Sequence, residues 1–305
     1  MYDLIIIGGG PGGVAAGVYA ARKKMKALLI ADSLSGQSVV SAGIENWIGT
    51  KLISGYDLAK NLEEHLRAQE GIEIIDDDRV IAVGKSGAGW SLTTKNGKTF
   101  EAKCILLASG SRRKKLGIPG EKELDGKGVV YCSTCDAPIF KNKTVAVVGG
   151  GNSALESVVD LLPYASKIYL LVRSEILKGD PVTQDTIKRH PNVEIIFNAV
   201  PQEILGSNFV TGIRYKEAKN GGMKELALDG VFVEIGLAPN SDFVKELVNR
   251  DDYGAVVVDP RTQATSAAGI WAVGDVTDCL YKQNNISAGD AVKAALNIYD
   301  YIKKL

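Results

Sequence analysis

The sequence contains little cysteine and almost no histidine. Its 305 residues include four cysteines and two histidines. Four cysteines are too few for the disulfide framework of a secreted protein, and the two histidines leave a zinc site short of ligands. Basic and acidic side chains number 36 each, so no excess of positive charge draws the chain toward nucleic acid or an anionic membrane.

Long apolar runs are also missing. No stretch approaches the roughly 18 apolar residues that a membrane-spanning helix needs. A strand-like apolar run begins at Asp3, which leaves no room for a secretory signal peptide. These absences predict a cytoplasmic protein that has neither nucleic acid nor a membrane as its partner. The length suggests about two domains.

One pattern occurs twice, in residues 3–32 and 144–173. Each copy has an apolar run, a glycine turn, a helical pattern with small residues on one face, and a second apolar run, which together predict a β-α-β unit. The turns fit G-x-G-x-x-G and G-x-G-x-x-A, a pattern that lets a dinucleotide diphosphate approach the N-terminus of a helix. A lone turn of this kind can serve helix packing only, but two copies in the same context predict two dinucleotide sites. The turn residues are Gly8, Gly10 and Gly13 in the first copy and Gly149, Gly151 and Ala154 in the second.

The two copies differ at the end of their second apolar run. The first copy has Asp32 there, and the second has Arg173 at the equivalent distance from its glycines. An acid accepts hydrogen bonds from the free ribose 2′-hydroxyl of FAD or NAD, whereas a guanidinium pairs with the 2′-phosphate of NADP. The first site is therefore predicted to bind FAD and the second NADPH, with NADH as the alternative. A solvated surface charge is the other interpretation of Arg173.

A stretch of alternating polar and apolar residues follows each unit. The first, 89–110, contains an Asn-Gly hairpin signal, and its counterpart covers 209–240. The last segment, 269–302, has a strand, a Gly-Asp turn and a helix without a complete unit of its own, so it is predicted to complete the first lobe. The predicted fold is α/β, with two Rossmann-like dinucleotide-binding domains, the second inserted in the first, each with an antiparallel β meander. The predicted domains are an FAD-binding domain at 1–113 and 243–305 and an NAD(P)H-binding domain at 114–242.

Cys132 and Cys135 form a C-x-x-C pair in the predicted second domain. No second such pair accompanies them, and the other possible ligands are scattered, so zinc is the weaker interpretation. No metal site is predicted elsewhere. A C-x-x-C pair can combine a thiolate nucleophile with a neighbouring thiol that resolves a mixed disulfide. The pair is therefore predicted to be a dithiol/disulfide switch.

In combination, these motifs resemble the low-molecular-weight thioredoxin reductases and the C-terminal part of the flavoprotein subunit of alkyl hydroperoxide reductase. The resemblance covers the whole chain, through "IIIGGGPGG", "GIENWIG", "YCSTCDAPIF", "GGGNSALES", "FVEIGLAPN" and "AVGDV". "CDAPIFKNK" and "LYKQ" are closer to the peroxide-reductase subunit. The thioredoxin-like N-terminal part of that subunit has no counterpart here, and an external disulfide carrier is expected to replace it.

The resemblance also implies the binding residues. The FAD site would comprise Gly8, Gly10, Pro11, Gly13, Asp32, Gln37, Asn46, Gly274, Asp275 and Gln283. The NAD(P)H site would comprise Gly149, Gly151, Asn152, Ser153, Ala154, Arg173 and Lys178. Ser35 replaces a glycine that is usual in the family. Val172 and Ser174 replace a histidine and a second arginine beside Arg173, so the preference for NADPH over NADH is only a tendency.

The same resemblance implies how the parts would act. Electrons would pass from the nicotinamide through FAD to a Cys132–Cys135 disulfide, with Cys135 against the flavin and Cys132 attacking the protein substrate. Asp136 would act as the acid/base for the departing thiolate, and its alternative is a helix cap. A rotation of one lobe would occur near 111–117 and 236–243, and the protein would be a homodimer.

The predicted function is that of a thioredoxin reductase-like enzyme, an FAD-dependent NAD(P)H:protein-disulfide oxidoreductase that reduces a thioredoxin-like or glutaredoxin-like protein. Two alternatives use the same residues: a flavin dithiol oxidase that passes electrons to oxygen, and a disulfide reductase with a non-nicotinamide donor such as ferredoxin. A flavin-binding module without catalysis would leave the C-x-x-C-D motif unexplained. The intact second glycine turn favours the nicotinamide-driven enzyme.

Overall fold

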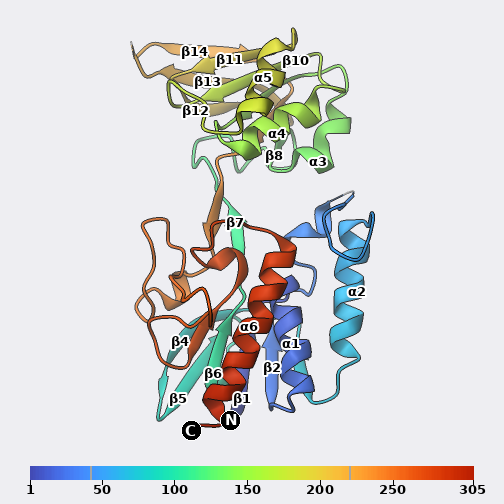
Figure 1. The fold of residues 1–305 in the computed structure, drawn as a ribbon. Coiled ribbons are helices and arrows are strands. Elements are labelled where there is room, and N and C mark those ends of the chain that lie inside the picture. The colour runs from blue at the N-terminus through green and yellow to red at the C-terminus, as the bar shows by residue number, and fades with distance from the viewer. Residues whose placement is uncertain (42, 220) are drawn as a thin grey trace. The chain divides into compact units, whose positions relative to one another are not determined.

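The chain passes from one unit into a second and back, and each unit is built on its own sheet of mainly parallel strands (Figure 1). Unit 1 consists of residues 1–112 and 238–305, and unit 2 consists of residues 113–237. The structure is a computed structural model that describes all residues except 42 and 220, and the side chains of residues 40, 134 and 135 lie outside the description.

The boundaries between the units lie near the ends of the predicted domains but differ at the second crossing. The sequence placed that boundary after residue 242, whereas residues 238–242 pack with unit 1. The N–H of Asn240 donates to the carbonyl of Gly110 at 2.9 Å, and the hydroxyl of Ser241 donates to the carbonyl of Gly254 at 2.5 Å. These bonds join segments that are distant in the sequence, so the local amino-acid composition could not predict them.

The sheet of unit 1 has the order β3-β2-β1-β6-β5-β4, and β17 pairs with β6. Strands β1, β2, β3, β6 and β17 are parallel, and β5 is antiparallel to both β6 and β4. The strands are β1 (Tyr2–Ile7), β2 (Ala27–Ile30), β3 (Ile72–Ile75), β4 (Val80–Ser86), β5 (Gly89–Thr94), β6 (Thr99–Leu107) and β17 (Ile270–Ala272).

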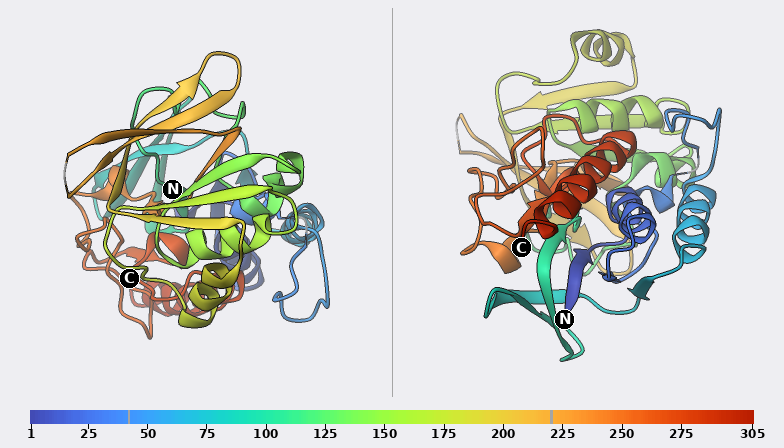
Figure 2. Two further views of the ribbon diagram at one scale, coloured as in Figure 1. Left: turned by 90° about the horizontal axis from the view of Figure 1, so that it is seen from above. Right: turned by 60° about the horizontal axis from the view of Figure 1, so that its bottom comes forward.

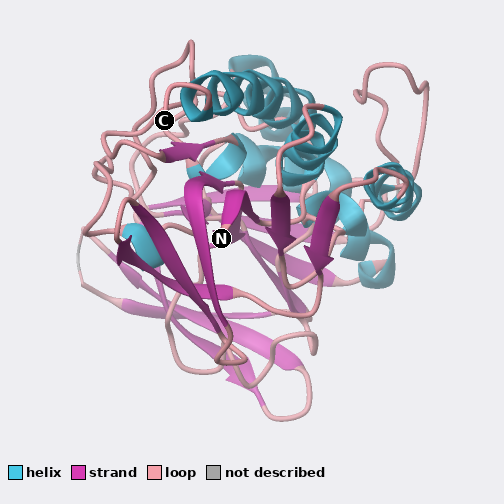
Figure 3. Ribbon diagram, turned by 90° about the horizontal axis from the view of Figure 1, so that it is seen from below, coloured by secondary structure: helices cyan, strands magenta, loops and turns pink. Residues whose placement is uncertain are grey.

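Both faces of this sheet are covered, which explains why its central strands are apolar without alternation. Leu4 and Ile6 of β1 pack with the helices on one face, whereas Ile5 and Ile7 pack on the other face with apolar residues of the segment 244–276. Figure 3 shows the helices, in cyan, gathered along one side of the strands of this unit. The long helices are α1 (Pro11–Arg22), α2 (Gly55–Arg67) and α6 (Asn284–Ile302).

The predicted hairpin at Asn96-Gly97 joins β5 to β6. Gly97 has φ +79°, and its N–H donates to the carbonyl of Thr94 at 3.0 Å, which closes the turn. Because β6 is also parallel to β1, the first meander continues the sheet of unit 1.

Unit 2 repeats the plan with a five-stranded parallel sheet in the order β11-β10-β9-β15-β8. Its meander is a separate antiparallel sheet in the order β12-β13-β14. The strands are β8 (Val129–Val130), β9 (Thr144–Val148), β10 (Lys167–Val172), β11 (Val193–Phe197), β12 (Ala199–Gly206), β13 (Val210–Glu217), β14 (Met223–Ala227) and β15 (Gly230–Val233). The helices are α3 (Ser133–Asp136), α4 (Asn152–Leu161) and α5 (Pro181–Arg189).

The parallel sheet of unit 2 lies between helices and meander. Val145 and Val147 of β9 pack with α4 and α5, whereas Ala146 and Val148 pack with the meander strands. Two more views of the ribbon appear in Figure 2. Short strands β7 (Ser111–Arg113) and β16 (Leu237–Pro239) pair with each other where the chain passes between the units, and short 3-10 helices cover Gln37–Val40, Ala137–Phe140, Asp242–Val244 and Gly274–Val276. Within the described residues, no helix is long and apolar enough to cross a membrane.

Candidate functional site

Unit 1 contains a cavity of about 920 Å³ at the carboxyl ends of its parallel strands. Its lining includes eight of the ten residues predicted to bind FAD, and residues of β1, of the turn after β2 and of the start of α6 contribute to it. The eight are Gly8, Gly10, Pro11, Asp32, Gln37, Gly274, Asp275 and Gln283.

The first glycine turn forms one wall of this cavity and has the shape that a dinucleotide requires. Gly8 has φ +114°, and a β-carbon there would collide with the carbonyl oxygen of Ala108. A β-carbon at Gly13 would collide with the carbonyl of Gly8, so Gly13 lets α1 approach β1 without lining the cavity itself. Helix α1 begins at Pro11 with Gly10 as its cap residue, which leaves the first N–H groups without a side-chain cap. Those N–H groups can donate hydrogen bonds to a diphosphate, so the residues present fit FAD.

Asp32 stands at the cavity wall after β2. Its side chain is exposed, and its Oδ2 lies 3.7 Å from Nη1 of Arg79, which also lines the cavity. A carboxylate in this position can accept bonds from ribose hydroxyls. Sequence reasoning did not identify Arg79, because nothing in the run of aspartates before it indicates proximity to Asp32.

Asp275 lies at the opposite end of the sequence from Gln37, yet the fold brings them together. The amide of Gln37 donates to Ser111 Oγ at 3.1 Å and to Asp275 Oδ2 at 3.4 Å, and Ser111 donates to the same carboxylate at 3.5 Å. Burial raises the pKa of Asp275, and Lys282 and Ser111 partly oppose this shift. Ser111 and Lys282 also line the cavity but were not predicted to do so.

Asn46 is not among the residues that line the cavity, although it was predicted to bind FAD. Its side-chain amide donates to Oε1 of Gln283 at 3.2 Å, and its carbonyl accepts from Asn285 at 2.6 Å. Asn46 therefore supports a lining residue at the start of α6.

The second glycine turn, in unit 2, repeats the geometry of the first. Gly149 has φ +150°, and a β-carbon there would collide with the carbonyl of Glu234; α4 begins after Gly151, and Ala154 is fully buried. The side chain of Asn152 accepts from the N–H of Asp180 at 2.6 Å, and the N–H of Lys178 donates to the carbonyl of Gly150 at 2.7 Å.

Arg173 and Lys178 both have exposed side chains. Among the described residues, none forms an ion pair or a side-chain hydrogen bond with Arg173, so its guanidinium is available to a ligand. The residues of the turn fit a dinucleotide, and Arg173 is accessible for a 2′-phosphate.

The cysteine motif follows β8 in unit 2. Cys132 precedes α3 and is part of a disulfide, whereas Cys104 and Cys279 are free. The side chain of Cys135 lies outside the described part of the structure. Within the described residues, no cluster of histidine, cysteine and acidic side chains could hold a metal ion.

Asp136 is the last residue of α3 and is half-buried. Its N–H donates to the carbonyl of Cys132 at 3.1 Å, and burial raises the pKa of its carboxyl group. The side chain does not cap α3 or the following short helix. A raised pKa suits a group that carries a proton, whereas the alternative of a helix cap is not observed.

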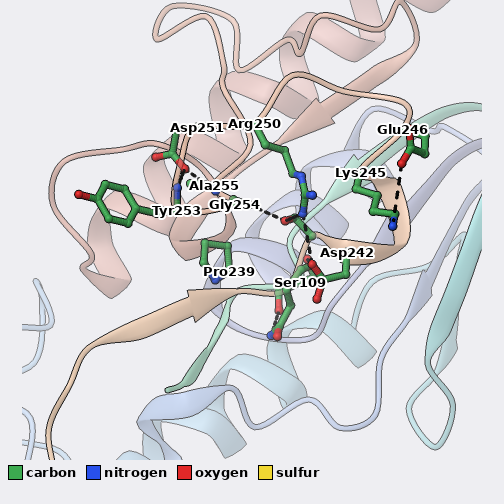
Figure 4. A network of polar contacts seen from close by, with 12 residues as sticks. Ser109, Pro239, Asp242, Lys245, Glu246, Arg250, Asp251, Tyr253, Gly254 and Ala255 are labelled. Carbon is green, nitrogen blue, oxygen red and sulfur yellow. Dashed lines mark hydrogen bonds and ion pairs between the residues drawn. The ribbon is translucent and has the colours of Figure 1, made fainter. Parts of the chain in front are cut away.

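The basic run after Ser111 has intramolecular partners. In unit 1, Arg112 donates to Asn240 at 3.0 Å and to Asp242 at 3.3 Å. Figure 4 shows Asp242 next to Arg250, whose guanidinium donates to it at 3.2 Å. These bonds fix both crossings of the chain on the side of unit 1.

Comparisons with known proteins agree with this geometry. The family model of pyridine nucleotide-disulphide oxidoreductases matches residues 2–295. The F subunit of the Staphylococcus aureus alkyl hydroperoxide reductase is 42% identical over 301 residues, which cover 99% of this chain and 59% of that protein. The chain thus spans about three fifths of the length of the curated relatives it matches.

Two solved structures cover nearly all of the chain. The thioredoxin reductase of Lactococcus lactis, in its FR conformation, has a TM-score of 0.87 and 33% identity and covers 100% of both chains. The thioredoxin reductase of T. acidophilum has a TM-score of 0.83 and 35% identity and covers 98% of both chains. The chain therefore belongs to the pyridine nucleotide-disulphide oxidoreductase family, and it is a flavoprotein disulfide oxidoreductase of the kind that uses FAD and NAD(P)H.

Proposed function

We propose that the protein is an NAD(P)H-driven reductase of a thioredoxin-like or glutaredoxin-like protein. The observation that carries this proposal is the disulfide of Cys132, which precedes a half-buried carboxyl group in the unit that also holds the second glycine turn. The similarity to thioredoxin reductases over the full chain supports it. The cytoplasmic location expected from the sequence and the homodimer implied by the family resemblance stay predictions.

The two dinucleotide sites would have different occupants. FAD would bind in the cavity of unit 1, where Asp32 would accept bonds from the adenosine ribose. NADPH would bind at the second turn, with Arg173 and Lys178 at its 2′-phosphate and NADH as the alternative. When bound, FAD supplies two-electron transfer between the nicotinamide and a disulfide.

The cysteines would exchange disulfides with the substrate in two steps. After reduction of a Cys132–Cys135 disulfide by two electrons, the Cys132 thiolate attacks the substrate disulfide and forms a mixed disulfide, and one substrate thiolate leaves. Cys135 then attacks the sulfur of Cys132, which releases the second substrate thiolate and restores the intramolecular disulfide. Asp136 donates a proton to a departing thiolate, a role that suits its raised pKa.

Both the cysteine motif and the nicotinamide site belong to unit 2, whereas the FAD cavity belongs to unit 1. Each must reach the same flavin in turn. We therefore propose that the chain near β7 and β16 is a hinge that absorbs a change in backbone conformation. The bonds of Asn240 and Arg112 within unit 1 would form the fixed base of that hinge.

The experiment is the substitution Cys132→Ser, assayed for NADPH-dependent reduction of a thioredoxin disulfide and of a glutaredoxin disulfide. We expect the variant to lose turnover of protein substrate but to keep bound FAD that NADPH still reduces. Cys104→Ala is the matched control, because Cys104 is fully buried and burial raises the pKa of its thiol to about 12. Normal turnover by the Cys132 variant would refute the assigned role.

A further inference from the structure

A buried carboxylate lies against the second glycine turn. Glu234 directly follows β15, its N–H donates to the carbonyl of Val148 at 2.9 Å, and its own carbonyl blocks a β-carbon at Gly149. The side chain of Glu234 is only 4% exposed. An acid is unexpected there, because the diphosphate that such a turn receives is also negative.

Two residues from other elements hold this carboxylate. Ser153, the second residue of α4, donates from Oγ to Oε2 at 2.8 Å. Arg113 of β7 donates from Nη1 to the same oxygen at 2.9 Å and forms an ion pair with it. Glu234 thereby connects the second glycine turn to the guanidinium of Arg113.

The pKa of Glu234 depends on its burial and on the polar and charged groups that face it. Burial raises the pKa of Glu234, and Arg113 and Ser153 oppose this shift. Asp160, farther along α4, adds negative charge and raises the pKa further. The positive charge of Arg113 is therefore what balances the carboxylate in this part of unit 2.

We propose that Glu234 and Arg113 are opposed affinity determinants for the nicotinamide nucleotide at the second turn, the acid weakening and the arginine strengthening the binding of its diphosphate. This inference rests on the proposed function, because it requires a nicotinamide nucleotide to bind at this turn. Weaker binding caused by Glu234 would favour release of the oxidised nucleotide after each turnover.

A purely packing role makes a different prediction from a charge role. If the three side chains only hold the turn in shape, loss of either charged partner disturbs the turn and weakens binding. If their charges set the affinity, neutralising the acid strengthens binding and neutralising the arginine weakens it. Glu234→Gln is suited to this test, because glutamine keeps the size of the side chain and an oxygen that can accept from Ser153.

The experiment measures the dissociation constants of NADP⁺ and NAD⁺ by calorimetry on FAD-loaded protein, so that no turnover is needed. We expect Glu234→Gln to lower the dissociation constant at least threefold, Arg113→Gln to raise it at least threefold, and the double variant to lie within twofold of the wild type. Lys143→Gln is the matched control, because it also removes a cation of unit 2 that is paired with an acid, here Asp229. Lys143 is exposed and directly precedes β9, so it lies at the end of that strand opposite the turn. Its dissociation constants should match those of the wild type.

Two results distinguish a failure of the proposed function from a failure of this inference alone. A wild-type protein that binds neither nucleotide overturns the proposed function and this inference with it. A wild type that binds while both single variants bind more weakly, or change by less than twofold, overturns the inference alone. If Arg113→Gln fails to fold, Glu234→Gln decides by itself, since a packing role predicts weaker binding and a charge role predicts tighter binding.

Discussion

At the scale of single residues, the structure reveals burial that the sequence does not. The family resemblance implied that Asp275 belongs to the FAD site, but only the fold shows that Gln37 and Ser111, far away in the chain, donate to its carboxylate. Glu234 is the one charged residue in the apolar run 230–238. A single charge in such a run is a sequence signal that could have identified it. The C-x-x-C pattern itself predicted a dithiol pair at Cys132, because that signal is local in the sequence, whereas the role of Asp136 came from the family resemblance.

Asp275→Asn should change how stability depends on pH. Because burial raises the pKa of Asp275, its contribution to folding is fully present below the pKa of an unfolded aspartate, about 3.9, and is lost as pH rises through the raised value. In urea unfolding of FAD-free protein, the variant should gain stability relative to wild type as pH rises from about 4 to 7. Asp259→Asn is the control, and it should instead lose stability relative to wild type as pH rises, because hydrogen bonds lower the pKa of Asp259. A pH-independent difference for Asp275→Asn would contradict this assignment.

Arg173→Ala should reduce the preference for NADPH. A charge-assisted contact with the 2′-phosphate contributes roughly 1.5–3 kcal/mol, which corresponds to about 10- to 150-fold in affinity. The kcat/KM for NADPH should fall by this factor, while that for NADH should change little. Arg189→Ala, at an exposed arginine of α5, serves as the control. A wild type that prefers NADH, or an unchanged ratio in the variant, would show that Arg173 is only a surface charge.

At the scale of elements, hydrophobic pattern predicted the strands that form the two parallel sheets. Both copies of the β-α-β unit form as expected, since β1 and β9 are apolar on both faces and their glycine turns are followed by α1 and α4. The pattern did not reveal that the first meander joins the parallel sheet whereas the second stands apart. That difference depends on pairing between distant strands, such as β1 with β6.

Gly13→Ala should prevent FAD from binding at the first site. The added β-carbon would collide with the carbonyl of Gly8, so α1 could no longer approach β1 and the turn would lose its shape. The purified variant should lack most of the flavin absorbance near 450 nm per polypeptide. Gly84→Ala is the control, because a β-carbon at Gly84 meets open space. Full flavin content in the Gly13 variant would mean that the turn does not depend on this approach.

At the scale of the whole molecule, one chain builds two nucleotide-binding units and inserts the second into the first. The incomplete last segment predicted this arrangement, and β17 does pair with β6 of unit 1. The crossings themselves could not be located from composition, because Asn240 and Arg112 are fixed by bonds between segments about 130 residues apart. In the proposed function, electrons pass from a nicotinamide bound to unit 2, through the flavin of unit 1, to the cysteines of unit 2.

An anaerobic titration of the FAD-loaded protein tests that path directly. A flavin and a disulfide each accept two electrons, so the wild type should consume about two equivalents of NADPH or NADH before its flavin absorbance is fully bleached. Cys132→Ser should need about one. Full bleaching of the wild type by about one equivalent would show that the disulfide does not exchange electrons with the flavin. No bleaching by either nucleotide would contradict reduction of the flavin by a nicotinamide, and it would point to a dithiol oxidase or to a reductase that takes electrons from a donor such as ferredoxin.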